Sequence, residues 1–355
     1  MTESAAAPPS GLRVLLVGTG VFSIPPTGYG GVERTLDELA RALTSAGASV
    51  EVLNEVRRGR TIDEYYFALH LKRLLRGRAY DALHASTPVV ANRLAMLGLP
   101  YVYTTHSRHW FLREGWRQSW GYFLERRAVL RARAAIALTK TLRDQMVRAL
   151  APRGPTEFPV VPIGVDLERF RADASARNGR RVLGVGVIRP FKRWEVAAQA
   201  LRGSGLELTI VGPISDPGYA AGLRAIGPHV RLAGELSEGE LTREFARSDL
   251  LVHPSSVELL AGVVLQGLAA GLPVVGAPPV ADLIDEGVTG FVVPDGDGTA
   301  AMSDRLAAVV TGILADPAMH RRMSEAARAS AERRFSWPAV ARAHLELYAR
   351  ARSAA

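Results

Sequence analysis

Short apolar segments alternate with amphipathic helical segments along the chain, and this alternation constrains the fold more than any other feature. The first apolar segment, Arg13 to Gly18, is rich in branched side chains and precedes a helical pattern. Further strand-like segments of the first half read SVEVL, YDALHAS, LPYVYTT, RAAIAL and FPVVPI. Such alternation predicts a parallel sheet that is doubly wound, with helices on both faces.

The alternation starts a second time at Arg180 to Val187 and continues through LELTIVG, VRLAG, DLLVHPS, LPVVGA and GFVVP. Between the two sets lies RFRADASARNGRR, which is polar and without periodicity and indicates a linker. A chain of 355 residues can bury two cores. We therefore predict two Rossmann-like α/β domains, over residues 1–165 and 166–335, that face each other across a cleft. A last helix, over residues 336–355, is expected to pack back on the first domain.

Composition excludes several classes of protein and site. The chain contains no cysteine, which excludes disulfides, thiolate zinc sites and cysteine nucleophiles. The first residues show no basic segment followed by an apolar core, so we expect no secretory signal and, by default, a cytoplasmic location. The most apolar segment, residues 259–277, is divided by Gly271 and Pro273, and it therefore predicts a buried helix and strand rather than a membrane span.

All of the excess positive charge lies in the first half. Residues 1–160 contain 22 Lys and Arg against 13 Asp and Glu, whereas the remainder contains 22 of each. Residues 105–153 hold 11 basic and 3 acidic side chains with aromatic residues between them. An anionic membrane surface, a pocket for an acidic acceptor and a solvated face all remain open as explanations. No zinc-finger, RNP or helix-turn-helix pattern favours a nucleic-acid partner.

A glycine-rich and proline-rich loop, SIPPTGYGG, separates the first strand from its helix. Its prolines hold the loop extended, and its glycines permit close approach of the backbone to a ligand. Free N–H groups at the start of the helix attract anions. The preceding GTGVFS lacks the third glycine of a dinucleotide fingerprint, which argues against a nicotinamide or flavin site. A phosphate ligand and a tight connection without a ligand both remain open.

A cluster of cations follows the first strand of the second half, where Arg189, Lys192 and Arg193 lie between a strand end and a helix start. Lys192 is one of only three lysines in a chain with 41 arginines. A lysine retained at this junction indicates a point charge for phosphate, with a solvated helix surface as the alternative.

The segment HPSSVELLAGVVLQGL contains further candidates. Glu258 is expected at a helix N-terminus, where a carboxylate is favoured and can accept sugar hydroxyls. Ala261 and Gly262 leave space for backbone N–H groups to meet a phosphate. Gln266 interrupts an apolar helix, and a buried amide needs a hydrogen-bonding neighbour or ligand. Downstream, PDGDG predicts a turn rather than a metal site at its two aspartates, Asp295 and Asp297.

Five segments occur in the same order as in a known family: GYGGVERTLDELARAL, VVPIGVDLERF, VIRPFKRWEVAAQAL, the run from VRLAGELSEGEL to GLPVV, and EGVTGFVVPDGD. Together they resemble the retaining GT-B glycosyltransferases of family four, from about residue 13 to residue 348. The resemblance implies an acceptor-binding N-terminal domain and a donor-binding C-terminal domain. It also implies a hexosyltransferase that needs no metal or other cofactor. A UDP- or GDP-type sugar would be the donor, and a hydroxyl of a small-molecule or lipid-linked acceptor would receive the sugar.

The resemblance also implies roles for individual residues. His106, Lys192 and Glu258 would be catalytic: His106 lies near the transferred sugar, Lys192 on the diphosphate and Glu258 on the sugar hydroxyls. The remaining donor-binding positions are Gly30, Gly31, Arg189, Arg193, Ala261, Gly262 and Gln266.

Three positions depart from the family pattern. Val187 stands where an arginine usually accompanies the lysine, Gln266 replaces a second glutamate, and Ile163 replaces an asparagine. An amide binds ribose hydroxyls less strongly than a carboxylate, because charge-assisted hydrogen bonds are stronger. A non-catalytic GT-B protein that binds a sugar or a partner through a weakened donor site is therefore the alternative.

The segment Trp110 to Arg133 combines tryptophans with arginines. Aromatic rings suit the headgroup zone of a membrane, and arginines suit lipid phosphates. Peripheral attachment to an anionic membrane, or contact with a lipid-linked acceptor, is the hypothesis for this segment.

Overall fold

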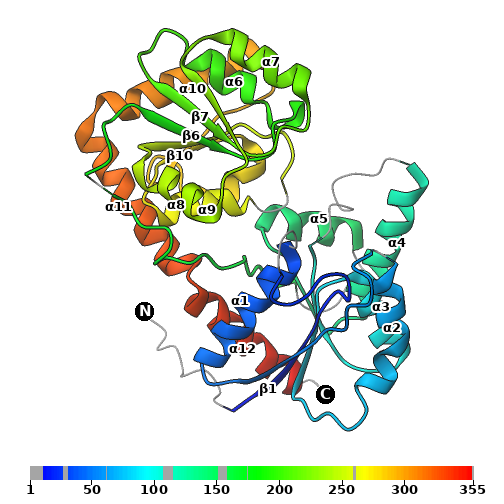
Figure 1. Cartoon of the computed structure of the whole chain (residues 1–355). Coiled ribbons are helices and arrows are strands. Elements are labelled where there is room, and N and C mark those ends of the chain that lie inside the picture. Colours follow the sequence, from blue (N-terminus) through cyan, green and yellow to red (C-terminus); the bar gives the residue numbers. More distant parts are fainter. Residues whose placement is uncertain are drawn as a thin grey trace. The chain divides into compact units, whose positions relative to one another are not determined.

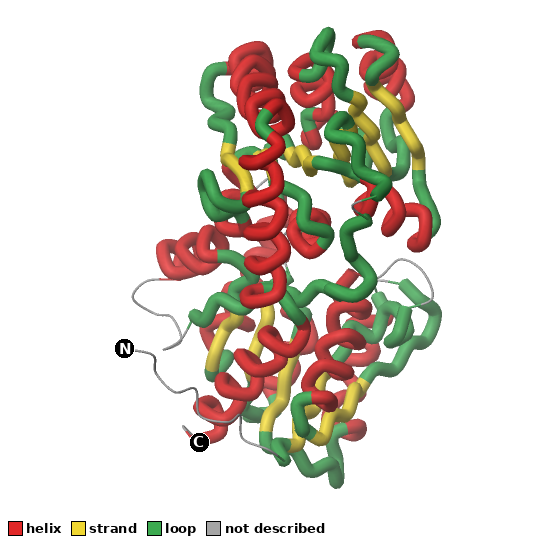
Figure 2. The backbone as a smooth tube through the Cα atoms, turned by 90° about the vertical axis from the view of Figure 1, so that its left-hand side faces the viewer, coloured by secondary structure: helices red, strands yellow, loops and turns green. Residues whose placement is uncertain are grey.

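The computed structural model describes residues 11–26, 31–60, 62–106, 115–150, 158–173, 175–258 and 261–353. The chain divides into two compact units. Unit 1 comprises Met1–Gly164 and Trp337–Ala355, and unit 2 comprises Val165–Ser336. In each unit helices flank a sheet of parallel strands, which confirms the predicted pair of doubly wound α/β domains (Figures 1 and 2).

Unit 1 contains a five-stranded parallel sheet in the order β2-β1-β3-β4-β5. Its strands are β1 (Arg13–Val17), β2 (Ser49–Leu53), β3 (Ala82–Ala85), β4 (Val102–Thr104) and β5 (Ala134–Ile136). The central strand β1 is buried from Val14 to Val17. A strand buried on both faces needs a continuous apolar run, which is why RVLLV forms this strand.

The helices of unit 1 are α1 (Gly31–Ser45), α2 (Asp63–Leu74), α3 (Pro88–Met96), α4 (Gly115–Arg131), α5 (Lys140–Leu150) and α12 (Trp337–Ser353). Helix α1 buries Leu36, Leu39 and Leu43, whose spacing of three and four residues places them on one face. This face packs against α12, so the last helix of the chain completes the core of unit 1.

Buried polar contacts fix α12 against the sheet. The hydroxyl of Tyr348 on α12 and Nδ1 of His84 on β3 are joined by a hydrogen bond of 2.6 Å. Nε2 of His84 is 2.8 Å from the hydroxyl of Thr104 on β4. Burial lowers the pKa of His84 well below its ordinary value, so the imidazole is neutral at pH 7. Both ring nitrogens of this buried histidine therefore have partners.

Unit 2 contains a six-stranded parallel sheet in the order β11-β10-β9-β6-β7-β8. Its strands are β6 (Arg181–Val185), β7 (Glu207–Val211), β8 (Val230–Gly234), β9 (Leu250–His253), β10 (Val274–Gly276) and β11 (Gly290–Val292). Its helices are α6 (Trp194–Ala200), α7 (Pro217–Ile226), α8 (Glu238–Arg247), α9 (Gly262–Ala269), α10 (Gly298–Ala315) and α11 (Pro317–Arg334), with 3-10 turns at Pro190–Lys192 and Pro278–Leu283.

N-capping residues stabilise the starts of several of these helices. Ser237 and Glu240 form a reciprocal capping box at the start of α8. Asp216 and Asp316 accept backbone hydrogen bonds at the starts of α7 and α11, and a proline follows each of them. These helix starts are therefore encoded within a few residues of sequence.

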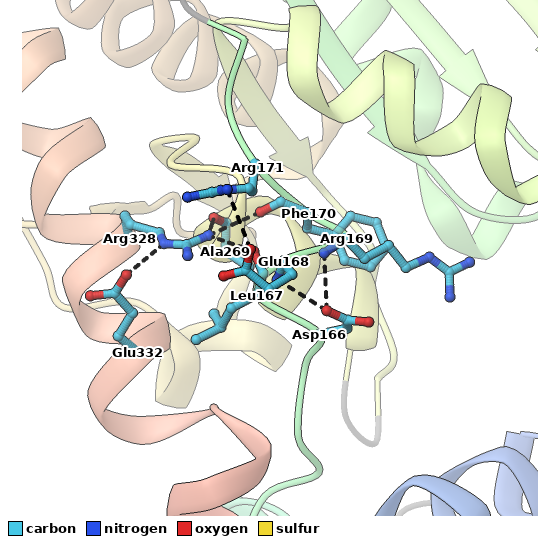
Figure 3. Close-up of polar contacts among 9 residues, drawn as sticks. All are labelled: Asp166, Leu167, Glu168, Arg169, Phe170, Arg171, Ala269, Arg328 and Glu332. Atoms are coloured by element: carbon cyan, nitrogen blue, oxygen red, sulfur yellow. Dashed lines mark hydrogen bonds and ion pairs between the residues drawn. The ribbon is translucent and has the colours of Figure 1, made fainter.

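The polar segment between the two sets of strands is held on unit 2 (Figure 3). Nη1 of Arg328, on α11, donates to the carbonyls of Leu167, Phe170 and Ala269 at 2.8 to 3.1 Å. Nε of the same guanidinium donates to Glu332 at 2.7 Å. One arginine thus joins this segment, the end of α9 and α11.

The most apolar segment of the sequence forms α9 and β10, as its division by Gly271 and Pro273 predicts. In the described residues no helix combines the length and the apolar character that crossing a membrane requires.

Replacing Tyr348 with Phe should destabilise unit 1. The change removes only the hydroxyl, and it leaves Nδ1 of His84 buried without a partner, which costs about 1 to 3 kcal/mol. Chemical denaturation of the two proteins measures this free energy of unfolding. Tyr65→Phe removes an exposed hydroxyl and serves as the control. An equal stability of Tyr348→Phe and wild type would show that the contact with His84 does not hold α12.

Candidate active site

Two chain segments meet at the carboxyl edge of the unit-2 sheet, because β6 and β9 are parallel neighbours. The segment after β6 contains the turn Pro190–Lys192, and the segment after β9 runs from Pro254 to Glu258. The N–H and the hydroxyl of Ser256 both donate to the carbonyl of Phe191 at 3.0 Å. Side chains about sixty residues apart in sequence therefore share one edge.

Trp194 fixes the start of α6 and the turn before it. Its fully buried ring packs on Gly184 of β6, where a Cβ atom would lie 2.7 Å from the ring. Its Nε1 donates to the carbonyl of Val187 at 3.1 Å. The glycine in β6 is therefore required for the tryptophan that holds the preceding turn, which contains the cations.

Lys192, His253 and Glu258 form one charged cluster at this edge. Nε2 of His253 is 2.8 Å from Oε1 of Glu258, and Nζ of Lys192 contacts the same carboxylate oxygen. The side chains of Lys192, Glu258 and His253 are 12%, 13% and 1% exposed. The structure thus brings together two of the three predicted catalytic residues, with a histidine that the sequence analysis did not select.

The neighbours of Glu258 keep it ionised. Burial by itself would raise the pKa of its carboxyl, but the hydrogen bond with His253 and the charges of its neighbours lower the pKa to about 2. Burial lowers the pKa of His253, against the opposing effect of Glu258. A neutral imidazole beside a carboxylate carries its proton on Nε2 and donates it, because a carboxylate only accepts.

Arg193 connects the segment after β9 with the segment after β11. It adopts a left-handed conformation with φ of 53°. Its Nε donates to the carbonyl of Pro254 at 2.7 Å and its Nη1 to Asp295 at 3.0 Å. Nη2 is buried and has no hydrogen-bond partner among the described residues. This guanidinium therefore has a donor nitrogen that none of the described residues uses.

The other charged candidates lie nearer the solvent. Arg189 is exposed at the start of the 3-10 turn. Asp297 pairs with Arg305 at 2.8 Å, so both aspartates of PDGDG have an arginine partner. In the part of the chain that the structure describes, no group of three or more His, Asp and Glu side chains could hold a metal ion.

Glu258 does not lie at a helix N-terminus, which corrects the expectation from sequence. Helix α9 begins at Gly262 with Ala261 as its N-cap, four residues beyond Glu258. The contacts of Glu258 with His253 and Lys192 hold its carboxylate instead of helical N–H groups.

Gln266 lies in the second turn of α9, and its Oε1 is buried without a hydrogen-bond partner among the described residues. The sequence analysis required a neighbour or a ligand for this amide. The described residues supply no neighbour for the oxygen, which is therefore open to a ligand or an ordered water.

The remaining candidates belong to unit 1. Gly31 is the first residue of α1, and a Cβ atom there would meet none of the described residues within 4 Å, so packing against them does not require a glycine. Gly30 lies outside the described residues. His106 follows β4 and lines a small cavity with His84 and His344. Burial, and then His344, lower the pKa of His106 to about 4, so its ring is neutral at pH 7.

His253 is the residue that sequence reasoning missed. The available signal was a histidine at the end of a strand, five residues before a candidate carboxylate. That signal becomes specific only when the structure shows the side chain fully buried and in contact with Glu258.

Family models match both halves of the chain. Residues 29–169 match the model described as Glycosyltransferase Family 4, and residues 180–312 match the model described as Glycosyl transferases group 1. The chain belongs to the GT-B glycosyltransferases.

Known proteins resemble this GT-B glycosyltransferase over nearly its full length. D-inositol 3-phosphate glycosyltransferase of Saccharomonospora viridis is 28% identical and covers 98% of this chain and 95% of its own. Sucrose-phosphate synthase from Thermosynechococcus elongatus is 20% identical with a TM-score of 0.76, over 97% of this chain and 100% of its own. Anabaena HepE in complex with UDP and glucose is 19% identical with a TM-score of 0.70, over 96% of this chain and 100% of its own.

Ionisation of Glu258 should stabilise this glycosyltransferase in a pH-dependent way. The pKa of Glu258 is lower in the folded protein than the ordinary 4.5, so its contribution is present above pH 4.5 and is lost as the pH falls toward 2. At pH 7, Glu258→Gln should therefore lower the free energy of unfolding by about 1 to 3 kcal/mol.

Chemical denaturation of Glu258→Gln and wild type at pH 7, 5, 4 and 3 checks this expectation. The difference between the two proteins should shrink at the two lowest values. Glu168→Gln, at an exposed ion pair with Arg171, is the control and should show a small difference throughout. A difference for Glu258→Gln that does not vary with pH would contradict the assigned ionisation.

Proposed function

We propose that the chain is a retaining, metal-independent glycosyltransferase of family four that moves a sugar from a nucleotide diphosphate sugar to an acceptor hydroxyl. The observation that carries the proposal is the cluster of Lys192, His253 and Glu258 at the carboxyl edge of the unit-2 sheet. Ligands of open α/β sheets bind outside the carboxyl ends of the strands. The UDP in the HepE complex supports a nucleotide sugar as the donor.

The cations of this edge would stabilise the leaving diphosphate. In this proposal Lys192 moves from Glu258 to the phosphates, and the unpaired Nη2 of Arg193 provides a second donor. Arg189 and the backbone N–H groups at Ala261 and Gly262 complete this positive surface. Fixed donors directed at developing negative charge are the electrostatic part of catalysis. No side chain needs to act as a covalent nucleophile.

Two side chains of unit 2 would accept hydrogen bonds from the transferred sugar and from the ribose. Glu258, kept ionised by its neighbours, accepts hydroxyls of the transferred sugar. The unpaired Oε1 of Gln266 accepts a ribose hydroxyl of a UDP- or GDP-type donor. From unit 1, the backbone at Gly30 and Gly31 would approach the donor phosphates, and the neutral ring of His106 would contact the transferred sugar. Unit 1 would bind the acceptor substrate, whose hydroxyl receives the sugar.

A non-catalytic protein with the same fold is the second candidate. Its support is the absence of an arginine at position 187, where the side chain of Val187 offers no positive charge to a diphosphate. A screen of UDP- and GDP-sugars for donor hydrolysis, combined with analysis of bound nucleotide, separates the two functions. Turnover supports the transferase, whereas nucleotide binding without turnover supports the second candidate.

Lys192→Ala should lower turnover or donor affinity at least about tenfold, because a desolvated contact with phosphate contributes about 1.5 to 3 kcal/mol. Steady-state kinetics and calorimetry with the donor found in the screen measure both quantities. Lys72→Ala removes an exposed lysine of unit 1 and is the matched control. Unchanged kinetics for Lys192→Ala would remove this residue from the site.

Gln266→Glu should preserve the fold and strengthen donor binding. A carboxylate offers two oxygens that form charge-assisted hydrogen bonds with ribose hydroxyls, where the amide offers one carbonyl oxygen. Calorimetric titration of both proteins with the same nucleotide decides the question. Weaker binding by the glutamate variant would mean that the site is built for an amide.

A further inference from the structure

Helix α2 of unit 1 carries a stripe of apolar side chains that face solvent. Ile62, Tyr65, Tyr66 and Leu69 are each between 44% and 62% exposed. Their spacing of three, four and seven residues places them on one side of the helix. Phe67, Ala68 and Leu71 on the opposite side are buried. The helix is therefore apolar on two opposite sides, of which only one is used for the core.

Exposed basic side chains flank this stripe at both ends. Arg57, Arg58 and Arg60 precede the helix, and Lys72 and Arg73 lie in its last turn. The guanidinium of Arg57 lies 5.1 Å from the centre of the Tyr66 ring, which is a cation–π contact. Positive charge thus adjoins the apolar stripe directly.

Neither acidic residue of α2 is exposed, and the carboxylate of Asp63 interacts electrostatically with Arg57 and Arg58. Asp63 is buried, and its carboxylate accepts the N–H groups of Arg58 and Arg60 at 2.8 and 3.0 Å. Burial raises the pKa of Glu64 to about 7. In the flanking segments, Glu51 pairs with Arg78, and Glu55 is an exposed acid beside three arginines.

The neighbouring helices of the same layer also expose large apolar side chains. Helix α2 packs on α3, which packs on α4, along one side of the unit-1 sheet (Figure 1). Met96 at the end of α3 and Trp120 and Phe123 on α4 are exposed, and the last two stack with ring centres 5.5 Å apart. In unit 2, by contrast, the exposed large apolar side chains of the described residues are Phe191, Ile214 and Val288.

A bilayer that contains anionic lipid matches this surface. Apolar and aromatic groups can enter the headgroup zone while lysines and arginines at both ends contact lipid phosphates. A nucleic acid would use the basic residues but would leave Ile62 and Leu69 without a role. A second copy of this chain would bring like charges together, because the same arginines and lysine would meet across the contact.

We propose that the outer face of α2, formed by Ile62, Tyr65, Tyr66 and Leu69 with its flanking arginines and lysine, docks unit 1 on an anionic lipid bilayer. This surface lies outside the Trp110 to Arg133 segment to which the sequence analysis assigned membrane contact. Residues 110–114 of that segment lie outside the described residues. The proposal does not depend on the reaction that the protein catalyses.

Co-sedimentation of the full chain with sucrose-loaded vesicles tests the proposal. We expect weak binding to phosphatidylcholine alone, stronger binding when phosphatidylglycerol is included, and weaker binding as salt is raised. The double variant Tyr65→Ser, Leu69→Ser should lower the partition coefficient at least about tenfold. Val288→Ser, at an apolar side chain of unit 2 that is 53% exposed, should leave it unchanged.

A second double variant, Lys72→Gln, Arg73→Gln, distinguishes the contribution of positive charge to vesicle binding from that of apolar insertion. It should lower binding at low salt by about tenfold, since each basic side chain near the surface strengthens attachment. Circular dichroism verifies that all variants are folded. Absence of binding to anionic vesicles at low salt overturns the proposal, as does binding that is insensitive to Tyr65 and Leu69. Self-association of the wild type that Tyr65→Ser, Leu69→Ser abolishes, without vesicle binding, would assign the face to a protein interface instead.

Discussion

A single carboxylate oxygen, Oε1 of Glu258, contacts both Lys192 and His253, and the local structure of the candidate site depends on this arrangement. Removal of one partner of a buried ion pair leaves an uncompensated charge, which lowers the free energy of unfolding. The pair therefore locks together the two segments that follow β6 and β9. It also holds Lys192 in place before a ligand arrives. In the proposed reaction the donor diphosphate competes with Glu258 for the lysine, so binding of the donor releases the carboxylate for the sugar hydroxyls.

Much of the fold could be predicted from sequence, because parallel strands that are buried on both faces consist of continuous apolar residues. RVLLV became β1, and the apolar segment around Gly271 and Pro273 became α9 and β10. The expectation that Glu258 lies at the start of α9 was wrong by four residues, because its carboxylate is held by Lys192, 66 residues away in sequence, and by His253 at the end of β9. A local helix pattern does not include the contact with Lys192, and such tertiary contacts override local helix signals.

The candidate site was only partly predictable for the same reason. The partnership of His253 with Glu258 depends on full burial of the histidine, and that of Arg193 with Asp295 crosses about a hundred residues. Gln266 is the converse case. The sequence required a partner for its amide, and the structure leaves Oε1 buried without one among the described residues, so this oxygen is open to a ligand or an ordered water.

Which apolar side chains of α2 face solvent cannot be predicted from the sequence and is seen only from their burial in the structure. In IDEYYFALHLKRLL the solvent stripe and the core stripe interleave, so the helix reads as apolar on most sides. The structure separates them, because Phe67 and Leu71 turn inward while Tyr65 and Leu69 stay exposed. An exposed apolar stripe promotes aggregation unless something covers it. The arginines and the lysine around this stripe repel a second copy of the chain, and they attract an anionic surface. Apolar contact and charge selection therefore act on the same partner, and a bilayer with anionic headgroups satisfies both at once.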